Sequence, residues 1–364
     1  YRKNAKTGGE RMRKGKRLIA WIMAVVMLFT ICVFGGNGTA EAAATTPVAK
    51  HGRLSVKGAD LVDSKGNKFQ LRGISTHGIN WDVGSPYVNK KAFKTLRDDW
   101  GVNAIRLAMY TEEYNGYCSG GSQAKLRKLV DKGVGYATDL GMYAIIDWHI
   151  LSDGNPNKNK AQAKKFFTTM AKKYKNNKNV IYEICNEPNG CGWKEIKSYA
   201  TDIIKTIRKY DKKAVIIVGT PTWSQLGTDG TSNEVADSPI KGYKNIMYSL
   251  HFYASEWAHN EYLPAKVAYA RKKKLPIIVS EFGLSPASGD GAINKASADK
   301  WMKLLNKYNI SYFCWSLSNK NESASLLKPS TKKTSGWKSG DLSTAGKYIK
   351  KKYLARKKAL GKKA

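Results

Sequence analysis

Residues 180–188 read VIYEICNEP, a short apolar run that leads into the polar pair Asn186 and Glu187. A second apolar run, IIVS at residues 277–280, leads in the same way into Glu281. Continuous apolar runs of this length are typical of strands that are buried on both faces, as in parallel sheets. Each of these two strands is therefore expected to carry a glutamate at its carboxyl end.

Six more apolar runs complete a set of eight strand candidates. The eight are residues 71–76, 104–109, 143–148, 180–185, 215–219, 246–252, 277–280 and 312–317. Between them, apolar residues recur at helical spacing, for example from Leu126 to Leu140 and from Ile196 to Ile207. Eight strand–helix units in roughly 300 residues predict an α/β fold, a (β/α)8 TIM barrel with a single catalytic domain.

The alternative architecture is a doubly wound open sheet. That fold carries a glycine-rich phosphate-binding loop after its first strand, and no such loop follows residues 71–76. Before that strand, residues 54–56 and 61–62, with a turn at residues 63–66, are expected to form a small hairpin that closes the bottom of the barrel.

The first 44 residues have the pattern of a secretory signal peptide. Basic residues between Arg11 and Arg17 precede an apolar stretch at residues 18–34, and small residues follow, AEAAA at 40–44. The alternative is a membrane anchor, since the apolar stretch is at the short limit for crossing a bilayer. Met12 opens a conventional signal sequence, which leaves open whether the residues before it lie upstream of the true start.

We therefore expect a secreted, extracellular protein from which the signal peptide is removed. Its catalytic domain is predicted to span residues 45–364. A Lys-rich tail is expected after a last helix near residues 345–353.

The chain is strongly basic, with 63 Lys and Arg against 28 Asp and Glu and a formal net charge of +35. Such a surplus raises the question of nucleic-acid binding. The lysines are scattered over many segments, however, and the sequence contains no signature of a nucleic-acid-binding module, so no nucleic-acid partner is predicted. A solvated surface that associates loosely with anionic cell-wall polymers accounts better for the charge.

Five cysteines are spread over the chain, and Cys32 belongs to the predicted signal peptide. An exported protein permits disulfides, and Cys118 with Cys191 is a plausible pair because both follow strands. Cys185 and Cys314 lie within apolar runs and are interpreted as small buried side chains. The sequence shows no Cys or His spacing of a metal site, so neither a metal nor a cofactor is predicted.

Polar and aromatic residues follow the strand candidates, where a barrel of this kind builds its active site. They are His77, Trp81, Arg106, Tyr114, His149, Asn186, Glu187, Trp223, His251, Tyr253, Glu281, Trp315, Lys320 and Glu322. Singly, most have an ordinary explanation as buried, paired or solvated side chains. Glu187 and Glu281 are harder to explain in that way, because a carboxylate at the end of an apolar strand is costly without partners. Hydrolysis of a glycosidic bond requires two such groups, one as acid and one as nucleophile or stabiliser.

Four motifs carry a resemblance to a known family. They are RLAMY at residues 106–110, IYEICNEPN at 181–189, HFYA at 251–254 and VSEFG at 279–283. From Gly52 to Tyr353 the chain resembles the cellulases of glycoside hydrolase family 5, especially secreted endo-β-1,4-glucanases of the Bacillus and Paenibacillus type. The resemblance implies a β-glucan polysaccharide as substrate and a retaining mechanism.

The resemblance also implies a role for each site residue, with Glu187 as general acid/base and Glu281 as nucleophile. Catalytic support is implied for Arg106, His149, Asn186, His251 and Tyr253. Sugar binding is implied for His77, Trp81, Tyr114, Trp223, Trp315, Lys320 and Glu322. Within these sets, Arg106 and Tyr253 would orient Glu281. Asn186 would donate a hydrogen bond to the sugar 2-hydroxyl.

Two other interpretations stay open. The same fold and catalytic pair could act on another β-1,4-glycan (mannan, xyloglucan or xylan), because the loops around the sugar subsites select the polymer. A non-catalytic polysaccharide-binding barrel is the third interpretation, and the presence of both carboxylates argues against it. The protein is expected to act as a monomer. The sequence leaves open the pH optimum, the processivity and the action on crystalline cellulose.

Overall fold

The computed structural model describes residues 46–361 of the chain. The predicted signal peptide, residues 1–44, lies outside the described residues and stays a prediction. Among residues 46–361, no helix is long and apolar enough to cross a membrane.

Eight parallel strands close into a barrel in the described part of the chain. They are β3 (Arg72–Thr76), β4 (Ala104–Tyr110), β5 (Tyr143–His149), β6 (Val180–Glu183), β7 (Ile216–Val218), β8 (Ile246–Tyr253), β9 (Ile277–Gly283) and β10 (Tyr312–Leu317). The ring closes because β10 pairs with both β3 and β9. The predicted (β/α)8 TIM barrel is therefore confirmed, and each predicted strand overlaps one of these eight.

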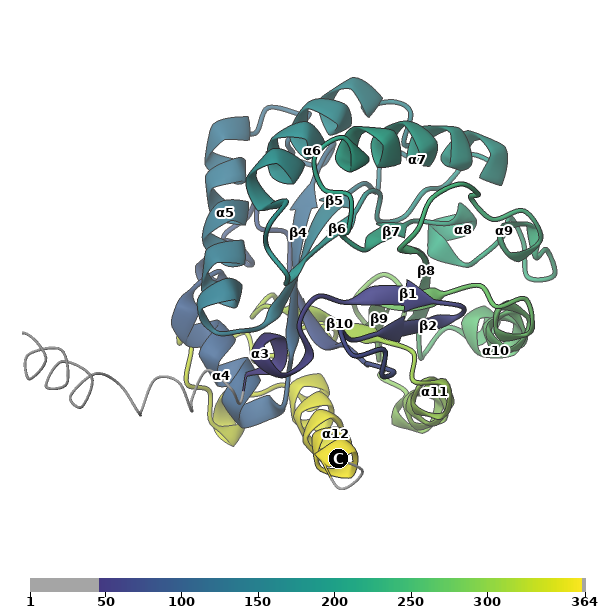
Figure 1. Cartoon of the computed structure of the whole chain (residues 1–364). Coiled ribbons are helices and arrows are strands. Elements are labelled where there is room, and N and C mark those ends of the chain that lie inside the picture. The colour runs from purple at the N-terminus through teal and green to yellow at the C-terminus, as the bar shows by residue number, and fades with distance from the viewer. Residues whose placement is uncertain (1–45, 362–364) are drawn as a thin grey trace, which may run out of the picture. The chain divides into compact units, whose positions relative to one another are not determined.

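Helices follow the strands and surround the barrel (Figure 1). The longer ones are α4 (Lys90–Trp100), α5 (Gln123–Asp139), α6 (Lys160–Tyr174), α7 (Trp193–Arg208), α10 (Trp257–Lys272), α11 (Lys295–Tyr308) and α12 (Thr344–Gly361). The shorter ones are α3 (Pro47–His51), α8 (Pro221–Ser224), α9 (Glu234–Asp237) and the 3-10 turns Ser85–Tyr87 and Ser339–Asp341. Between β7 and β8, only the short helices α8 and α9 occur.

The helix α7 shows how the local sequence produces these elements. At its start, the Glu195 side chain accepts a hydrogen bond from the Gly192 backbone N–H at 3.1 Å, which satisfies a group that the helix itself leaves unpaired. Ile196, Ile203 and Ile207 recur at helical spacing and are fully buried against the barrel. The apolar face predicted from the sequence is thus the face that packs.

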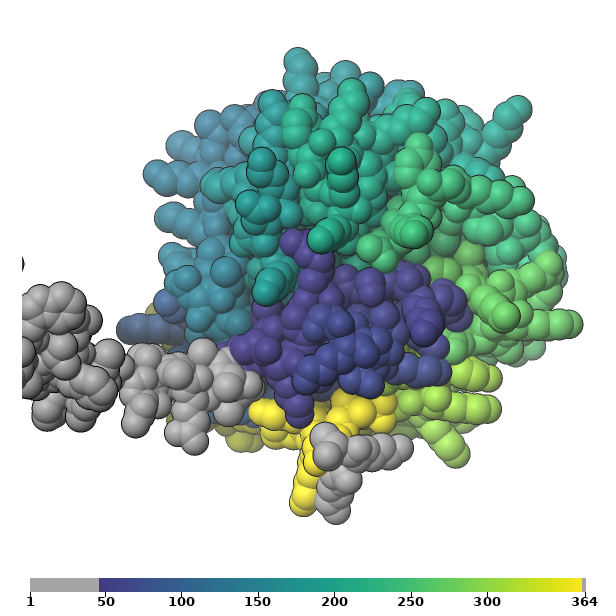
Figure 2. All heavy atoms as spheres, viewed as in Figure 1, coloured from purple at the N-terminus to yellow at the C-terminus, as the bar shows by residue number. Residues whose placement is uncertain are grey.

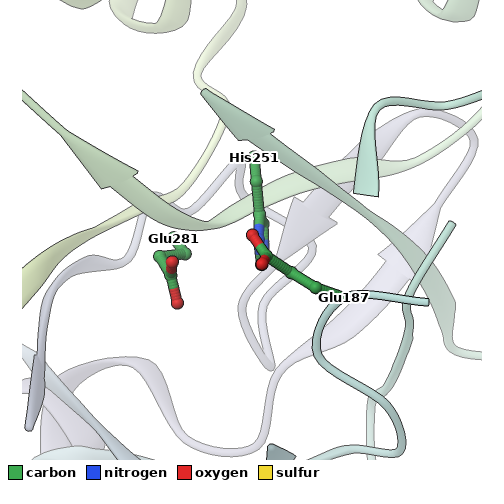
Figure 3. Close-up of side chains that lie close together, drawn as sticks. All are labelled: Glu187, His251 and Glu281. Atoms are coloured by element: carbon green, nitrogen blue, oxygen red, sulfur yellow. The ribbon is translucent and has the colours of Figure 1, made fainter. Parts of the chain in front are cut away.

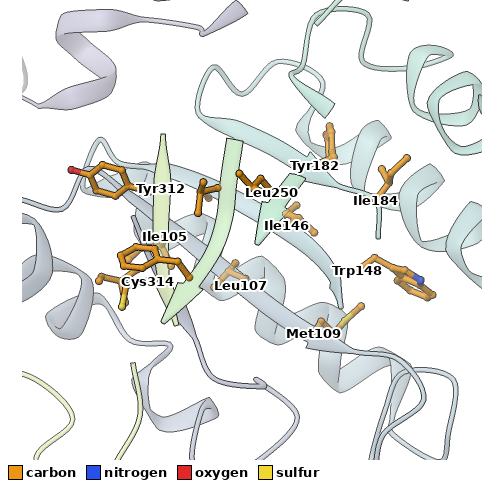
Figure 4. Packing of buried hydrophobic residues seen from close by; sticks show 14 of the residues in the cluster. Ile105, Leu107, Met109, Ile146, Trp148, Tyr182, Ile184, Leu250, Tyr312 and Cys314 are labelled. Carbon is orange, nitrogen blue, oxygen red and sulfur yellow. The ribbon is translucent and has the colours of Figure 1, made fainter. Parts of the chain in front are cut away.

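In each strand, alternate residues point into the barrel. Along this inward series the residues change from apolar at the amino end to polar at the carboxyl end. In β5, Tyr143 and Ile145 belong to an apolar cluster inside the amino end of the barrel. Ile146 and Trp148 pack outward, in the cluster between strands and helices (Figure 4). Asp147 continues the inward series, and the residues of this series at the carboxyl ends are the ones that build a polar site.

A hairpin of β1 (Ser55–Lys57) and β2 (Asp60–Val62) closes the amino end. Leu54 and Leu61 join the apolar cluster inside the barrel, as predicted. In Figure 2, purple residues of the N-terminal part cover the centre of this face. The predicted position of the turn between the two hairpin strands was wrong, however. The strands turn between Lys57 and Asp60, where Gly58 has a φ of 58° that suits glycine in a two-residue hairpin.

The predicted turn at residues 63–66 exists, but it follows the hairpin. Its cause is Asp63, whose side chain accepts hydrogen bonds from the backbone N–H groups of Lys65 and Asn67, both at 2.9 Å. Such an aspartate stabilises its own turn.

The prediction for the Lys-rich C-terminal segment also needs correction. It is not a tail after the last helix, because α12 continues to Gly361. Lys, Arg, Leu and Ala favour helix, and Ile349 and Tyr353 anchor the helix by burial. The Tyr353 hydroxyl donates to the Gly73 carbonyl at 2.8 Å.

The four cysteines within residues 46–361 are free thiols. The disulfide that we considered between Cys118 and Cys191 is therefore not formed in the structure. Both side chains are half-buried against the core, and burial raises their pKa, to about 12 for Cys118 and about 11 for Cys191. Cys185 and Cys314 are buried as predicted.

Candidate active site

A cavity of about 600 Å³ opens at the carboxyl ends of the strands. Eleven of the fourteen predicted site residues line it: His77, Trp81, His149, Glu187, Trp223, His251, Tyr253, Glu281, Trp315, Lys320 and Glu322. Arg106 and Asn186 are buried and bonded to lining residues. Tyr114 does not line the cavity.

Glu187, His251 and Glu281 meet in the middle of this cavity (Figure 3). One side-chain oxygen or nitrogen of each residue lies within 4.8 Å of those of the other two. The two carboxylates come from the ends of β6 and β9, which lie on opposite sides of β7 and β8 in the ring. These three side chains offer the donor atoms of a metal site as well, and the absence of a metal stays a prediction.

A bulge in β9 directs Glu281 into the cavity. Between β8 and β9 the pairing advances from Ser249↔Ile278 to His251↔Glu281, so β9 uses three residues where β8 uses two. The pairing of β9 with β10 shifts in the same region. The extra residue lets the consecutive residues Ser280 and Glu281 both contact groups of the site, since each is hydrogen-bonded to side chains of β8. Bulges of this kind re-aim side chains at active sites.

Two donors hold the Glu281 carboxylate. The Arg106 Nη1 group donates to one oxygen at 2.9 Å, and the Tyr253 hydroxyl donates to the other at 2.8 Å. Charge-assisted bonds of this type favour and orient the ionised form. The orientation predicted for Glu281 is the one that the structure has.

Arg106 is the centre of a buried charge network that the sequence did not reveal. Its Nε donates to Glu183 at 2.7 Å, and its Nη2 lies 3.0 Å from the Asp147 carboxylate. Burial opposes the charge of Arg106, but the three surrounding carboxylates outweigh burial and raise its pKa. The sequence does contain one sign of this network. Asp147 and Glu183 stand inside apolar runs, at the inward positions of β5 and β6, where a buried carboxylate needs a partner.

Glu187 has the opposite surroundings. Its side chain is 13% exposed, and no arginine or lysine contacts it among the described residues. Burial raises its pKa from the ordinary 4.5 to about 8, and the negative charges of Asp147 and Glu183 add to the effect while Arg106 opposes it. Glu187 is therefore a protonated acid at neutral pH.

A chain of hydrogen bonds explains how His251 supports that state. The Glu183 carboxylate accepts from the Ser249 hydroxyl at 3.2 Å, and the Ser249 oxygen lies 2.7 Å from that of Ser280. Since each serine has one proton, Ser280 donates to Ser249 and accepts from His251 Nε2 at 2.9 Å. His251 Nδ1 then carries no proton, because burial lowers the pKa of this imidazole to about 4.

The free lone pair of Nδ1 faces Glu187 Oε1 at 2.8 Å. This nitrogen can accept the carboxyl proton of Glu187, but it repels an ionised carboxylate. The chain from Glu183 to His251 therefore favours the acid form of Glu187, in the same direction as burial.

His149 and Asn186 form the floor of the site. His149 Nδ1 donates to Asp147 at 2.6 Å, and burial lowers the pKa of this histidine to about 3. Asn186 accepts from Arg106 at 2.6 Å and donates to His149 Nε2 at 3.2 Å and to the Ile150 carbonyl at 3.1 Å. Both amide protons of Asn186 thus have partners, so a bond to a sugar 2-hydroxyl would compete with the long contact to His149.

Aromatic and charged groups line one end of the cavity. The Trp315 ring stacks on His149, with centroids 5.2 Å apart, and lies 5.1 Å from His77. Lys320 and Glu322 form an ion pair at 2.5 Å. Burial raises the pKa of Glu322, and Lys320 opposes this. Trp315, Lys320 and Glu322 therefore line the cavity, and the sugar binding that the resemblance implies for them stays a prediction.

Tyr114 is the one predicted site residue that neither lines the cavity nor bonds to a lining residue through its side chain, and its role in sugar binding stays a prediction. Its side chain is 81% exposed and is not among the lining residues of the cavity. Only its carbonyl takes part, accepting from Trp81 Nε1 at 2.6 Å. Tyr110, which stands in the quoted RLAMY motif, lines the cavity and packs on Trp81.

Further lining residues were missed by the sequence analysis. They are Tyr110, Glu113, Leu151, Gln225, Glu256, His259, Ala287, Ser288 and Gly289. Most lie in loops two to eight residues beyond a strand, where no periodic pattern indicates the direction of a side chain. Glu113 is notable because its Oε2 is buried and has no hydrogen-bond partner among the described residues.

The closed parallel barrel brings an acid-form carboxyl and a donor-held carboxylate into one open cavity, which are the two groups that a glycoside hydrolase requires. Residues 62–321 match the family described as Cellulase (glycosyl hydrolase family 5). The chain belongs to this family. Its assignment to the Bacillus and Paenibacillus type stays a prediction.

Several characterised bacterial enzymes are similar to the chain. An endoglucanase of Clostridium saccharobutylicum is 47% identical over 92% of this chain and 72% of its own length. Endoglucanase 5 of Pectobacterium carotovorum subsp. carotovorum is 45% identical over 89% of this chain and 62% of its own length. The catalytic domain of Thermobifida fusca endoglucanase Cel5A is 37% identical, with a TM-score of 0.78 over 85% of this chain and 99% of that domain.

Proposed function

We propose that this protein is an endo-β-1,4-glucanase that cleaves internal bonds of a β-glucan with retention at the anomeric carbon. The observation that carries the proposal is the approach of Glu187 and Glu281 to within 4.8 Å in one cavity. Carboxyl groups about 5–5.5 Å apart are typical of retaining enzymes, whereas inverting enzymes hold them about 6.5–9.5 Å apart. The endoglucanase relatives, and a variant of the Thermobifida fusca enzyme in complex with cellotetraose, support β-1,4-glucan as substrate.

In the first step, a carboxylate oxygen of Glu281 attacks the anomeric carbon and forms an ester. The Glu187 proton passes to the glycosidic oxygen as the bond between that oxygen and the anomeric carbon breaks. The bonds from Arg106 and Tyr253 keep the attacking carboxylate in place.

In the second step, Glu187 is a carboxylate and takes a proton from water. The water oxygen bonds to the anomeric carbon, the ester to Glu281 breaks, and both side chains return to their starting states. The lone pair of His251 Nδ1 makes ionised Glu187 a strong base, which favours this proton transfer. The elevated pKa thus serves both steps.

The test uses the two isosteric variants Glu187→Gln and Glu281→Gln. Each is expected to lose at least about a thousandfold in the rate of reducing-sugar release from carboxymethyl cellulose, because each removes one reacting group. Circular dichroism should show an unchanged fold. Wild-type-like turnover by either variant would refute the assignment of the pair, and proton NMR of the first product separates retention from inversion.

The same reducing-sugar assay, applied to several polysaccharides, identifies the preferred β-1,4-glycan. A panel of cellulose derivatives, mannan, xyloglucan and xylan should show the highest turnover on the glucan. A preference for one of the others would keep the catalytic pair and change the substrate. Binding without turnover on every polymer would support a non-catalytic barrel.

The protein is further proposed to be secreted and monomeric. The signal-peptide pattern of residues 1–44 supports secretion. Without these residues the formal net charge is still +29, which supports a loose association with anionic cell-wall polymers. Gel filtration of the purified protein measures the oligomeric state.

A further inference from the structure

Exposed aromatic side chains concentrate at the end of the barrel that holds the active site. The large hydrophobic side chains exposed among residues 46–361 are Tyr114, Trp223, Trp257, Tyr262 and Leu354. The four aromatic ones all follow the carboxyl end of a strand, after β4, β7 or β8. Trp223 lines the cavity, whereas Trp257 and Tyr262 have no part in the site described above.

Trp257 and Tyr262, the outer aromatic pair, lie in the first half of α10. Their ring centroids are 5.8 Å apart at an interplanar angle of 81°, an edge-to-face contact that favours this arrangement of the two rings. Even so, Trp257 is 68% exposed and Tyr262 is 38% exposed. An indole ring that is mostly exposed to solvent contributes little to the packing of the barrel, and a pair of exposed aromatic rings beside a cavity points to a binding role.

The pair continues the wall of the cavity. Glu256, directly before Trp257, lines the cavity and accepts a hydrogen bond from the Ala287 backbone N–H at 2.7 Å. His259, two residues after Trp257, lines the cavity too and is buried. Trp257 therefore stands between two cavity-lining residues in the sequence, at the first position of α10.

The other flank of the pair joins the loop that carries Trp223. A Cβ atom at Gly230 would lie 2.8 Å from the Tyr262 ring, so this loop packs closely on the ring. Lys266 links α10 to the same loop, since its Nζ donates to the Gln225 carbonyl at 3.1 Å. Trp223, Gln225 and the outer aromatic pair thus belong to one connected wall.

We propose that Trp257 and Tyr262 form an outer sugar subsite, which stacks on glucosyl units of a β-1,4-glucan chain that leaves the cavity past Trp223. The ligand follows from the proposed function of the cavity. The C–H faces of a pyranose ring are apolar and suit aromatic faces, and the ring hydroxyls at the edge can bond polar neighbours such as Glu256. The subsite would be occupied only by chains long enough to extend beyond the cavity.

The experiment compares substrates of increasing length. For Trp257→Ala and Tyr262→Ala, kcat/KM on cellotetraose should equal that of the wild type. On cellohexaose and carboxymethyl cellulose it should fall about three- to tenfold, which corresponds to the loss of one stacking contact. Trp257→Phe, which keeps a ring, should recover part of the loss. Leu354→Ala, an exposed apolar site on α12, is the matched control and should change nothing.

Several outcomes would overturn the inference. Equal losses on all lengths would mean that the substitutions disturb the cavity itself, and no loss on any length would mean that no sugar binds there. A change in oligomeric state without a length effect would make the pair a contact between copies of the chain. If the wild type cleaves only another β-1,4-glycan, the proposed function fails, but the length test can be repeated with oligosaccharides of that glycan.

Discussion

Glu187 and Glu281 are the same residue type, and their neighbours give them different chemistry. Glu281 is held by Arg106 and Tyr253. Glu187 meets a histidine nitrogen without a proton and is shielded from water. The difference between acid and nucleophile therefore depends on groups that do not touch the substrate, above all on buried Glu183.

The pH dependence of the reaction follows from Glu187. Its acid form is lost as pH rises through about 8, so kcat/KM should fall on the alkaline side near that pH. Ser280→Ala cuts the chain to Glu183 and lets His251 present an Nδ1 proton to ionised Glu187. The alkaline limb should then move down by about 0.5–1 pH unit, since one hydrogen bond is worth about 1 kcal/mol and one pKa unit about 1.4 kcal/mol.

The control for this measurement is Ser311→Ala. Ser311 is equally buried, but it lies at the amino end of β10, where its hydroxyl oxygen accepts from the Leu71 backbone N–H. Its pH profile should match that of the wild type. An unshifted profile in Ser280→Ala would show that the serine chain does not set the state of His251.

Glu187 should also make the fold less stable at high pH. The unfolded side chain releases its proton near pH 4.5, but the folded one keeps it up to about pH 8. Between these values the folded state binds more protons, so the free energy of unfolding falls as pH rises. Glu187→Gln removes this effect and should be more stable than the wild type at pH 9 by about 1–4 kcal/mol, because one pKa unit is worth about 1.4 kcal/mol.

Urea unfolding at several pH values measures this difference. The advantage of Glu187→Gln should be small at pH 5 and should grow up to pH 8. A constant difference across that range would contradict a raised pKa as its cause. Such a gain in stability at the expense of activity is common for catalytic residues.

Strand β9 illustrates how an element is adapted to the site. Its bulge brings Ser280 to His251 and Glu281 to Tyr253, so one irregularity supports both reacting carboxyl groups. The strand ends at Gly283, where the Tyr253 ring leaves no space for a side chain. A Cβ atom at this position would lie 2.5 Å from that ring.

Gly283→Ala should therefore impair catalysis indirectly, through Tyr253, although residue 283 does not line the cavity. The added methyl group pushes the Tyr253 ring away, and Glu281 loses a donor. We expect kcat to fall about tenfold or more, because a hydrogen bond to a charged group is worth about 1.5–3 kcal/mol. Stability should fall by about 1–3 kcal/mol from overpacking.

Gly135→Ala is the matched control. Gly135 lies within α5, and a Cβ atom there would have no neighbour within 4 Å. Alanine should stabilise this helix by up to about 1 kcal/mol and leave kcat unchanged. If Gly283→Ala kept full activity, the bond from Tyr253 would not matter for the nucleophile.

The barrel separates stability from function along its axis. The amino end is filled by an apolar cluster and closed by the β1–β2 hairpin, whereas the carboxyl end holds the charge network and the cavity. Both ends are built by the same strands, because successive inward residues change from apolar to polar. The site can therefore bury several charges without weakening the packed end of the barrel.

The positive net charge, +29 for residues 45–364, is a property of the whole molecule and should act at longer range. Binding to phosphate-rich cell-wall material should decrease steeply between about 0.05 M and about 0.5 M NaCl, since salt screens exposed charges. Co-sedimentation measures this, and wall material stripped of its phosphate polymers serves as the control. Salt-independent binding would exclude charge as its cause.

Residue patterns alone predicted the eight strands, the helices between them, the closed barrel and most of the groups in the cavity. They could do so because burial on both faces requires apolar runs, and a polar residue after such a run marks the strand end. The patterns could not predict the bulge in β9, the exposure of the Tyr114 side chain or the hydrogen-bond chain from Glu183 to Glu187. Each depends on the register between strands or on the path of a loop, and both are set by neighbours distant in sequence.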